Sequence, residues 1–278
     1  MDYKLLAIDM DDTLLGDDLK ISERTQERIR LARDMGVRVI ISTGRMFRSI
    51  VPFIKELELD GPSLVYNGAM VNKLNDEKPL LHYPIPSQYA VQISNIVEEA
   101  GFQLNAYVDD KLYVRKRTPE VLDYMDRTGV DSTEVGPIGD FLAGNSAVNA
   151  KVRNPTKLLV IHTDIPEINE MKEKLKDEFG DELSITGSKP YFIEITAKDI
   201  SKGNTLAELA EMFDIDREEV IAIGDGMNDY EMIQWAGLGV AVENAHPDLK
   251  EEADYVTASC NDDGVAQVID KFILKGRE

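Results

Sequence analysis

The sequence has few of the residues on which the commonest metal, redox and nucleic-acid sites depend. Cys260 is its single cysteine, which leaves no partner for an internal disulfide and no cysteine cluster for zinc. The histidines, His82, His162 and His246, are far apart and show no ligand spacing. There are 31 basic residues against 52 acidic ones, a formal net charge of −21, so neither nucleic acid nor an anionic membrane is expected as the main partner.

Long apolar runs are also lacking. No run reaches the roughly 18 to 20 residues of a transmembrane helix, and residues 1–9 become charged too early for a signal peptide. We therefore expect a soluble cytoplasmic protein. Hydrophobic residues make up 43% of the 278 residues, which is enough for a folded core and excludes a wholly disordered chain. A chain of this length is typical of about two domains.

Short apolar segments alternate with helical patterns at both ends of the chain. The expected strands lie at residues 4–9, 37–42, 63–67, 220–225, 239–242 and 255–257. The helices expected between them lie at about 22–35, 47–59 and 201–213. This alternation is typical of βαβ units, and we expect an α/β fold with a Rossmann-like parallel sheet.

The pattern changes in the middle of the chain. Short apolar segments flank the polar turn 75–78, which predicts a hairpin, and Pro84 and Pro86 follow it. Beyond them, strands are expected at 102–108, 111–115, 157–162 and 191–196, with helices around Val97, 119–127 and Met171. We therefore divide the chain into a core, residues 1–85 and 197–278, and an inserted α+β domain, residues 86–196.

Acidic residues follow two of the predicted core strands. Asp9 and Asp11 come at the end of the first strand, and Asp225 and Asp229 follow strand 220–225. Either stretch alone could be an ordinary polar turn, because Asp is common in turns. However, ligands of open α/β sheets bind beyond the carboxyl ends of the strands, so the two stretches are expected to converge. Carboxylates that converge without histidine or cysteine favour Mg²⁺ over zinc.

Two further segments are suited to an anion. Thr43 offers a hydroxyl and Gly44 a backbone N–H at the end of the second strand, although an ordinary Thr-Gly turn would look the same. Lys202 follows Ser201 at a predicted helix start, where a cation opposes the helix dipole and a compensating anion is favoured. Without the other motifs, Lys202 would be read as a solvated surface lysine.

In this order, the motifs resemble those of the haloacid dehalogenase-like hydrolase superfamily. They are Asp-x-Asp-x-Thr at 9–13, Ser-Thr-Gly-Arg at 42–45, Lys202, and Gly-Asp-x-x-Asn-Asp at 224–229. The insert that follows Asn67-Gly68-Ala69 is similar in place and size to the large cap of the Cof-type phosphatases. Asp12 stands where many relatives have glycine and Ser42 where many have alanine, and neither change removes a group that the family's mechanism needs.

The resemblance implies an Mg²⁺-dependent phosphatase of small phosphorylated metabolites, most commonly sugar phosphates, that works through an aspartyl-phosphate. It implies Asp9 as the nucleophile and Asp11 as the general acid and base. The implied Mg²⁺ ligands are Asp9, Asp225 and the backbone carbonyl of Asp11, with Asp229 either a direct ligand or a support for the others. The implied phosphate-binding residues are Met10, Thr43, Gly44, Lys202 and Asn228. Arg45 and Asn67 are close enough to these motifs to contact substrate, and the cap would act as a lid that sets specificity.

The same residues leave other functions to consider. A phosphomutase or phosphotransferase of the superfamily would use the same aspartyl-phosphate, and the sequence does not separate it from a phosphatase. A non-catalytic phosphometabolite-binding protein would be expected to lose Asp9 or Asp11. A dinucleotide-dependent oxidoreductase needs an early glycine fingerprint, whereas the loop 224–229 comes late and has Asn228 at its third glycine position. An EF-hand loop would need other residues at Thr13 and Leu14.

Overall fold

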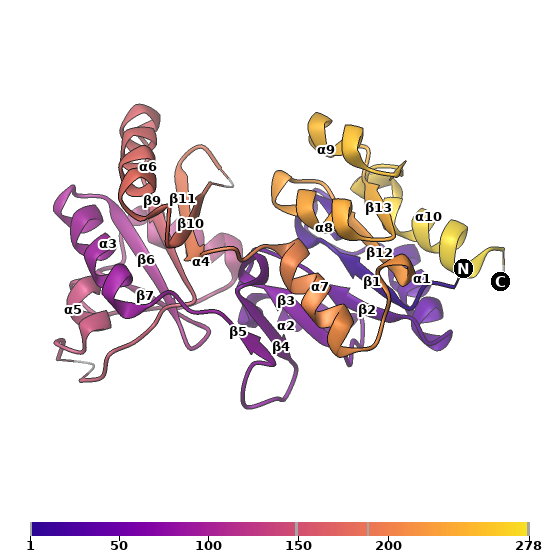
Figure 1. Ribbon diagram of the computed structural model, residues 1–278, viewed down its shortest axis with the longest axis horizontal. Helices are drawn as coiled ribbons and strands as arrows, with labels where there is room; N and C mark the ends of the chain where they lie inside the picture. Colours follow the sequence, from indigo (N-terminus) through magenta and orange to yellow (C-terminus); the bar gives the residue numbers. More distant parts are fainter. Residues whose placement is uncertain (1, 148–149, 188, 277–278) are drawn as a thin grey trace. The chain divides into compact units, whose positions relative to one another are not determined.

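The computed structural model describes residues 2–147, 150–187 and 189–276, without the side chain of Arg127 (Figure 1). The chain forms two compact units. The core unit comprises Met1–Arg45, Ile50–Leu81 and Ser201–Glu278, and the insert unit comprises Met46–Ser49 and His82–Ile200. The insert unit is thus somewhat longer than residues 86–196, because His82 and Ile85 hydrogen-bond within it, to Thr156 Oγ1 and to the carbonyl of Pro155.

The core unit is built on a five-stranded parallel sheet in the order β14-β13-β12-β1-β2. Its strands are β1 (Leu5–Ile8), β2 (Arg38–Ile41), β12 (Val220–Gly224), β13 (Leu238–Ala241) and β14 (Tyr255–Val256). The central strand β1 is buried along its whole length, as its uninterrupted apolar sequence predicts for a strand covered on both faces. Ile8 of β1 pairs with both Ile41 of β2 and Ile223 of β12, so these three strands end side by side at the carboxyl edge of the sheet. This confirms the predicted α/β class with a parallel core.

Helices lie between and after these strands along the chain. They are α1 (Glu23–Asp34), α2 (Phe47–Glu56), α7 (Lys202–Met212), α8 (Tyr230–Trp235), α9 (Pro247–Glu252) and α10 (Gly264–Val268). Leu206 and Leu209 of α7 share one apolar cluster with Leu5 of β1, while α1 contacts β2 and α10. Ser22 and Ser201 cap α1 and α7, each accepting a backbone N–H three residues on.

Residues 63–67 do not simply extend the parallel sheet. β3 (Pro62–Val65) pairs antiparallel with β4 (Met70–Lys73), and β5 (Leu81–His82) completes a separate three-stranded sheet. The expected strand ends early because Tyr66 and Asn67 turn the chain with positive φ values of 54° and 55°. Gly68 continues the turn at φ 102°, and a Cβ there would lie 2.4 Å from the carbonyl oxygen of Ser201.

The insert unit contains a six-stranded sheet in the order β10-β11-β9-β6-β7-β8. Its strands are β6 (Gln103–Val108), β7 (Lys111–Val114), β8 (Ser132–Glu134), β9 (Lys157–Ile161), β10 (Leu183–Thr186) and β11 (Phe192–Ala197). Its helices are α3 (Ser87–Glu99), α4 (Pro119–Thr128), α5 (Ile138–Ala143) and α6 (Ile165–Phe179). Among the described strand pairs of this sheet, only β7 and β8 are parallel. One sheet face packs on α3, α5 and α6, which confirms an α+β insert.

Across the described residues, no helix has both the length and the apolar character needed to cross a membrane.

Candidate active site

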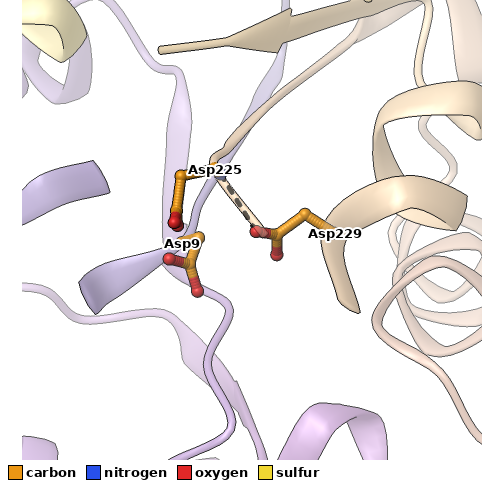
Figure 2. A group of neighbouring side chains, drawn as sticks. All are labelled: Asp9, Asp225 and Asp229. Atoms are coloured by element: carbon orange, nitrogen blue, oxygen red, sulfur yellow. Dashed lines mark hydrogen bonds between the residues drawn. The ribbon is translucent and has the colours of Figure 1, made fainter. Parts of the chain in front are cut away.

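Three carboxylates gather at the carboxyl edge of the core sheet (Figure 2). Asp9 follows β1, Asp225 follows β12, and Asp229 ends the helical turn Met227–Asp229 that leads into α8. One oxygen from each of these side chains lies within 4.8 Å of the others. Asp9 is 5% exposed and Asp229 is fully buried, whereas Asp225 is half-buried. The two acidic stretches therefore converge as the strand-end argument predicts.

Backbone geometry fixes Asp229 in this cluster. Its Oδ2 accepts hydrogen bonds from the N–H groups of Asp225, at 3.1 Å, and Gly226, at 3.0 Å. A Cβ at Gly224 would lie 2.5 Å from the carboxyl carbon of Asp229. Glycine at the end of β12 is thus what lets this carboxylate fold back against the strand.

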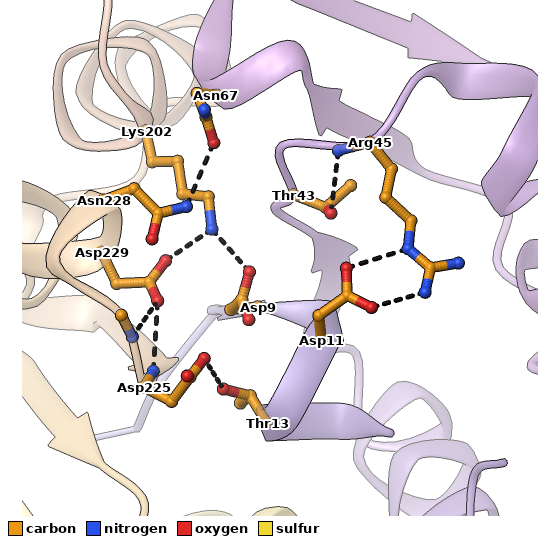
Figure 3. A network of polar contacts seen from close by, with 11 residues as sticks. Asp9, Asp11, Thr13, Thr43, Arg45, Asn67, Lys202, Asp225, Asn228 and Asp229 are labelled. Carbon is orange, nitrogen blue, oxygen red and sulfur yellow. Dashed lines mark hydrogen bonds and ion pairs between the residues drawn. The ribbon is translucent and has the colours of Figure 1, made fainter. Parts of the chain in front are cut away.

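Lys202 supplies a positive charge to the cluster (Figure 3). Its Nζ donates to Asp9 Oδ1 at 2.5 Å and to Asp229 Oδ1 at 2.6 Å, and its side chain is fully buried. Burial lowers the pKa of the Lys202 ammonium, but the two carboxylates outweigh burial and raise it above the usual value. Lys202 is therefore charged at neutral pH, yet it is one cation among three carboxylates.

The excess negative charge raises the pKa values of the carboxyl groups in the cluster. Burial and the neighbouring Asp229 raise the pKa of Asp9 well above its usual range, although Lys202 opposes them. Burial and Asp229 also raise the pKa of Asp225 to about 6, against the opposing hydrogen bond from Thr13. A divalent cation would relieve this repulsion, and a donor set made only of carboxylate oxygens fits Mg²⁺ better than zinc.

Magnesium is expected to bind more weakly as the pH falls through about 6. The pKa of the Asp225 carboxyl is raised from 3.8 to about 6, so this group takes up a proton as the pH falls through that value. Mg²⁺ must displace the proton in order to bind. Affinity should fall by up to about tenfold per pH unit below that value. Because the folded state binds this proton more tightly than the unfolded chain, Asp225 by itself makes the metal-free fold less stable as the pH rises from about 4 to about 6. Bound Mg²⁺ should offset that loss.

Calorimetric titration with Mg²⁺ and melting curves with and without Mg²⁺, at about pH 5 and about pH 7.5, measure both effects. An equal rise in Tm on adding Mg²⁺ at the two pH values would contradict this account. The Asp225→Asn variant is the control, because it removes this titrating group and should lose the part of the pH dependence that Asp225 contributes.

The segments predicted to bind an anion meet the same edge (Figure 3). Thr43 is buried in the loop after β2, and its backbone carbonyl accepts a hydrogen bond from Asn67 N–H at 3.0 Å. Asn228 Nδ2 donates to Asn67 Oδ1 at 3.1 Å, so the turn after β3 is tied to the turn after β12. A Cβ on Gly44 would lie 2.8 Å from that same Asn67 oxygen. Thr43, Gly44, Asn67 and Asn228 thus belong to one network.

Asp11 faces away from the carboxylate cluster. Its side chain pairs with Arg45, whose Nε and Nη2 donate to its two oxygens at 2.9 and 2.5 Å. The backbone carbonyl remains the group by which Asp11 would serve a metal. Met10 precedes it and is buried. The side chain of Asp11 therefore lies outside the cluster formed by Asp9, Asp225 and Asp229.

Two residues support the site in roles that the sequence did not predict, although Thr13 belongs to the first motif. Thr13 donates its hydroxyl to Asp225 Oδ1 at 3.0 Å, linking the first acidic stretch to the second. Asn244 donates to the carbonyl of Asp12 at 2.7 Å and accepts a hydrogen bond from Cys260 N–H at 2.9 Å. Asn244 lies just beyond β13, so the strand-end rule that selected Asp9 and Asp225 could have found it as well.

The sequence model of one family, haloacid dehalogenase-like hydrolase, matches residues 6–269. This chain belongs to that family. The match spans both core segments and the insert, and it confirms the resemblance drawn from the four motifs.

Relatives of this haloacid dehalogenase-like hydrolase match it along nearly its whole length. The 5-amino-6-(5-phospho-D-ribitylamino)uracil phosphatase YcsE of Bacillus subtilis is 32% identical, over 99% of this chain and 97% of its own. The pyridoxal phosphate phosphatase YbhA of Escherichia coli is 28% identical, over 99% of this chain and 100% of its own. A crystal structure of a haloacid dehalogenase-like hydrolase from Bacteroides thetaiotaomicron superposes with a TM-score of 0.87, at 28% identity, over 97% of this chain and 99% of that one.

Proposed function

We propose that this hydrolase is an Mg²⁺-dependent phosphatase of small phosphorylated metabolites that works through an aspartyl-phosphate on Asp9. The observation that carries the proposal is the meeting of Asp9, Asp225 and Asp229 within 4.8 Å, beside the buried Lys202. The names of YcsE and YbhA support the substrate class, since a phosphoribitylamino-uracil and pyridoxal phosphate are both small phosphate esters. A phosphorylated sugar or sugar-like chain is the substrate we favour.

In the proposed reaction the Asp9 carboxylate attacks phosphorus and the bond to the ester oxygen breaks. Asp11 gives its proton to the leaving oxygen, and later takes one from the water that hydrolyses the aspartyl-phosphate. Asp9, Asp225, Asp229 and the carbonyl of Asp11 would hold Mg²⁺, which when bound neutralises charge on the phosphoryl group. The covalent intermediate divides one slow hydrolysis into two easier reactions.

The remaining network residues would bind the phosphoryl oxygens. Lys202 has three N–H donors and contacts two carboxylates, so it can turn one donor to the phosphoryl group while keeping Asp229. The Thr43 hydroxyl, the Asn228 amide, and the backbone N–H groups of Gly44 and Met10 would supply the other bonds. Donors fixed in advance around developing charge are the main source of catalysis in phosphoryl transfer.

We assign substrate selection to the insert unit. The four motifs lie outside it, at positions up to 45 and from 202 on, and so does Asn67. The insert is therefore the part of the chain that is free to differ between relatives that act on different esters, while the core chemistry stays the same.

A screen of phosphorylated metabolites tests the proposal. We expect release of inorganic phosphate from at least one small ester in Mg²⁺, and loss of that release when a chelator removes the metal. Product analysis separates hydrolysis from transfer, because a mutase would leave the phosphoryl group on an organic acceptor. No phosphate release from any ester, or release that the chelator does not affect, would contradict the proposal.

Replacing one proposed metal ligand should weaken magnesium dependence and activity together. The Asp225→Asn variant keeps an oxygen but loses the charge, and we expect the Mg²⁺ concentration at half-maximal rate to rise by about 10- to 100-fold. Asp34→Asn, the same change at an exposed position on α1, is the matched control and should behave as wild type. A wild-type Mg²⁺ titration for Asp225→Asn would count against the assignment.

A further inference from the structure

The guanidinium of Arg45 donates a hydrogen bond to each of the two carboxylate oxygens of Asp11 (Figure 3). The side chain of Arg45 is 18% exposed, whereas that of Asp11 is 47% exposed. Two parallel bonds from a planar guanidinium fix both the direction and the plane of a carboxylate, which the single point charge of a lysine does not. The geometry therefore constrains a carboxyl group that would otherwise be free to rotate between staggered positions.

Arg45 is itself held in place. Its backbone N–H donates to Thr43 Oγ1 at 3.2 Å, and its carbonyl accepts a hydrogen bond from Tyr66 N–H at 2.9 Å. The guanidinium carbon lies 5.9 Å from the centre of the Phe53 ring. Because both its backbone and its side chain are anchored, Arg45 is a rigid support for Asp11.

From this pair we infer that Arg45 is a positioning residue that acts through Asp11, aiming its carboxyl group at the leaving oxygen. The inference rests on the proposed phosphatase reaction. When the bond from phosphorus to the leaving oxygen breaks, the proton passes from Asp11 to that oxygen, and Asp11 becomes the carboxylate that Arg45 pairs with. Arg45 thus stabilises the charge that forms on Asp11 as the leaving group departs. A misplacement of about 1 Å in such a group can cost about 100-fold in rate.

Leaving-group dependence separates this role from direct binding of substrate. An alkyl phosphate needs a proton on its leaving oxygen, whereas p-nitrophenolate leaves without one. For Arg45→Gln we expect kcat/KM to fall about 10- to 100-fold on an alkyl phosphate that the wild type hydrolyses, but less than about threefold on p-nitrophenyl phosphate. Equal losses on the two substrates would overturn the inference and indicate that Arg45 contacts the phosphoryl group instead.

A double-mutant cycle tests whether Arg45 works through Asp11. If it does, Arg45→Gln should cost almost nothing further in an Asp11→Asn background, whereas additive losses would overturn the inference. Arg45→Lys should restore only part of the alkyl phosphate activity, since lysine keeps the positive charge but lacks the two parallel N–H donors of the guanidinium. Arg30→Gln, at an exposed position on α1, is the matched control and should match wild type in rate and in Tm.

The same assays tell the two proposals apart. A wild type that releases no phosphate from any ester of the screen contradicts the phosphatase proposal itself. A wild type that is active, with an Arg45→Gln variant that folds but loses both substrates equally, contradicts only the role of Arg45.

Discussion

Asp9→Asn is expected to stop phosphate release, with kcat lower by at least about 10⁴-fold. An amide is a poor nucleophile towards phosphorus, so the covalent step fails even though the side chain keeps its shape. The fold should survive, because an asparagine oxygen can still accept the hydrogen bond from Lys202, and Lys202 keeps its contact with Asp229. Since burial raises the pKa of Asp9, removing its charge should leave the metal-free Tm equal or higher.

Steady-state phosphate release in Mg²⁺, with a melting curve for each protein, measures this result. The Asp34→Asn variant carries the same chemical change at an exposed position on α1 and should be fully active. Normal phosphate release by a correctly folded Asp9→Asn variant would show that the nucleophile is another residue.

Lys202→Met is expected to harm both activity and stability. The fully buried Lys202 bridges Asp9 and Asp229, and its loss leaves two carboxylates buried without a cation. Removing one partner of a buried ion pair typically costs about 3 to 5 kcal/mol of unfolding free energy. The loss of a fixed donor to the phosphoryl group should lower kcat by about 100- to 1,000-fold.

Magnesium provides an internal check on Lys202→Met, because it adds positive charge to the same cluster. Addition of Mg²⁺ should therefore raise the Tm of Lys202→Met by more than it raises that of the wild type. Lys4→Met, at an exposed lysine that pairs with Glu219, is the control and should show neither effect. Wild-type kinetics and stability for Lys202→Met would place that side chain outside the reaction.

The core of the fold follows from the sequence because its signals are local. Short apolar segments predicted β1, β2 and β12, and Ser22 and Ser201 predicted two helix starts. The short helices α8 to α10 were missed because five or six residues are too few to show a helical period. The antiparallel pairing of β3 was missed because it depends on the left-handed turn at Tyr66 and Asn67, which propensity does not foresee.

The candidate site could be predicted to the level of which strand ends meet, but not to the level of which side chains pair. Parallel register alone brings Asp9 and Asp225 together, since Ile8 and Ile223 are paired. The pairing of Asp11 with Arg45 instead depends on side-chain rotamers 34 positions apart in the chain. Sequence spacing gave Arg45 only as a possible substrate contact, and the structure places its guanidinium on Asp11.

Chemical trapping of Asp9 tests the central claim most directly. The Asp11→Asn variant, given p-nitrophenyl phosphate and Mg²⁺, should form the aspartyl-phosphate without needing an acid but should hydrolyse it slowly. Quenching with borohydride reduces an acyl phosphate to an alcohol, and mass spectrometry then locates the modified residue. We predict homoserine at position 9, dependent on both substrate and Mg²⁺. An unmodified Asp9 in protein that has released p-nitrophenolate, or a trapped carboxyl at any other position, would contradict the account.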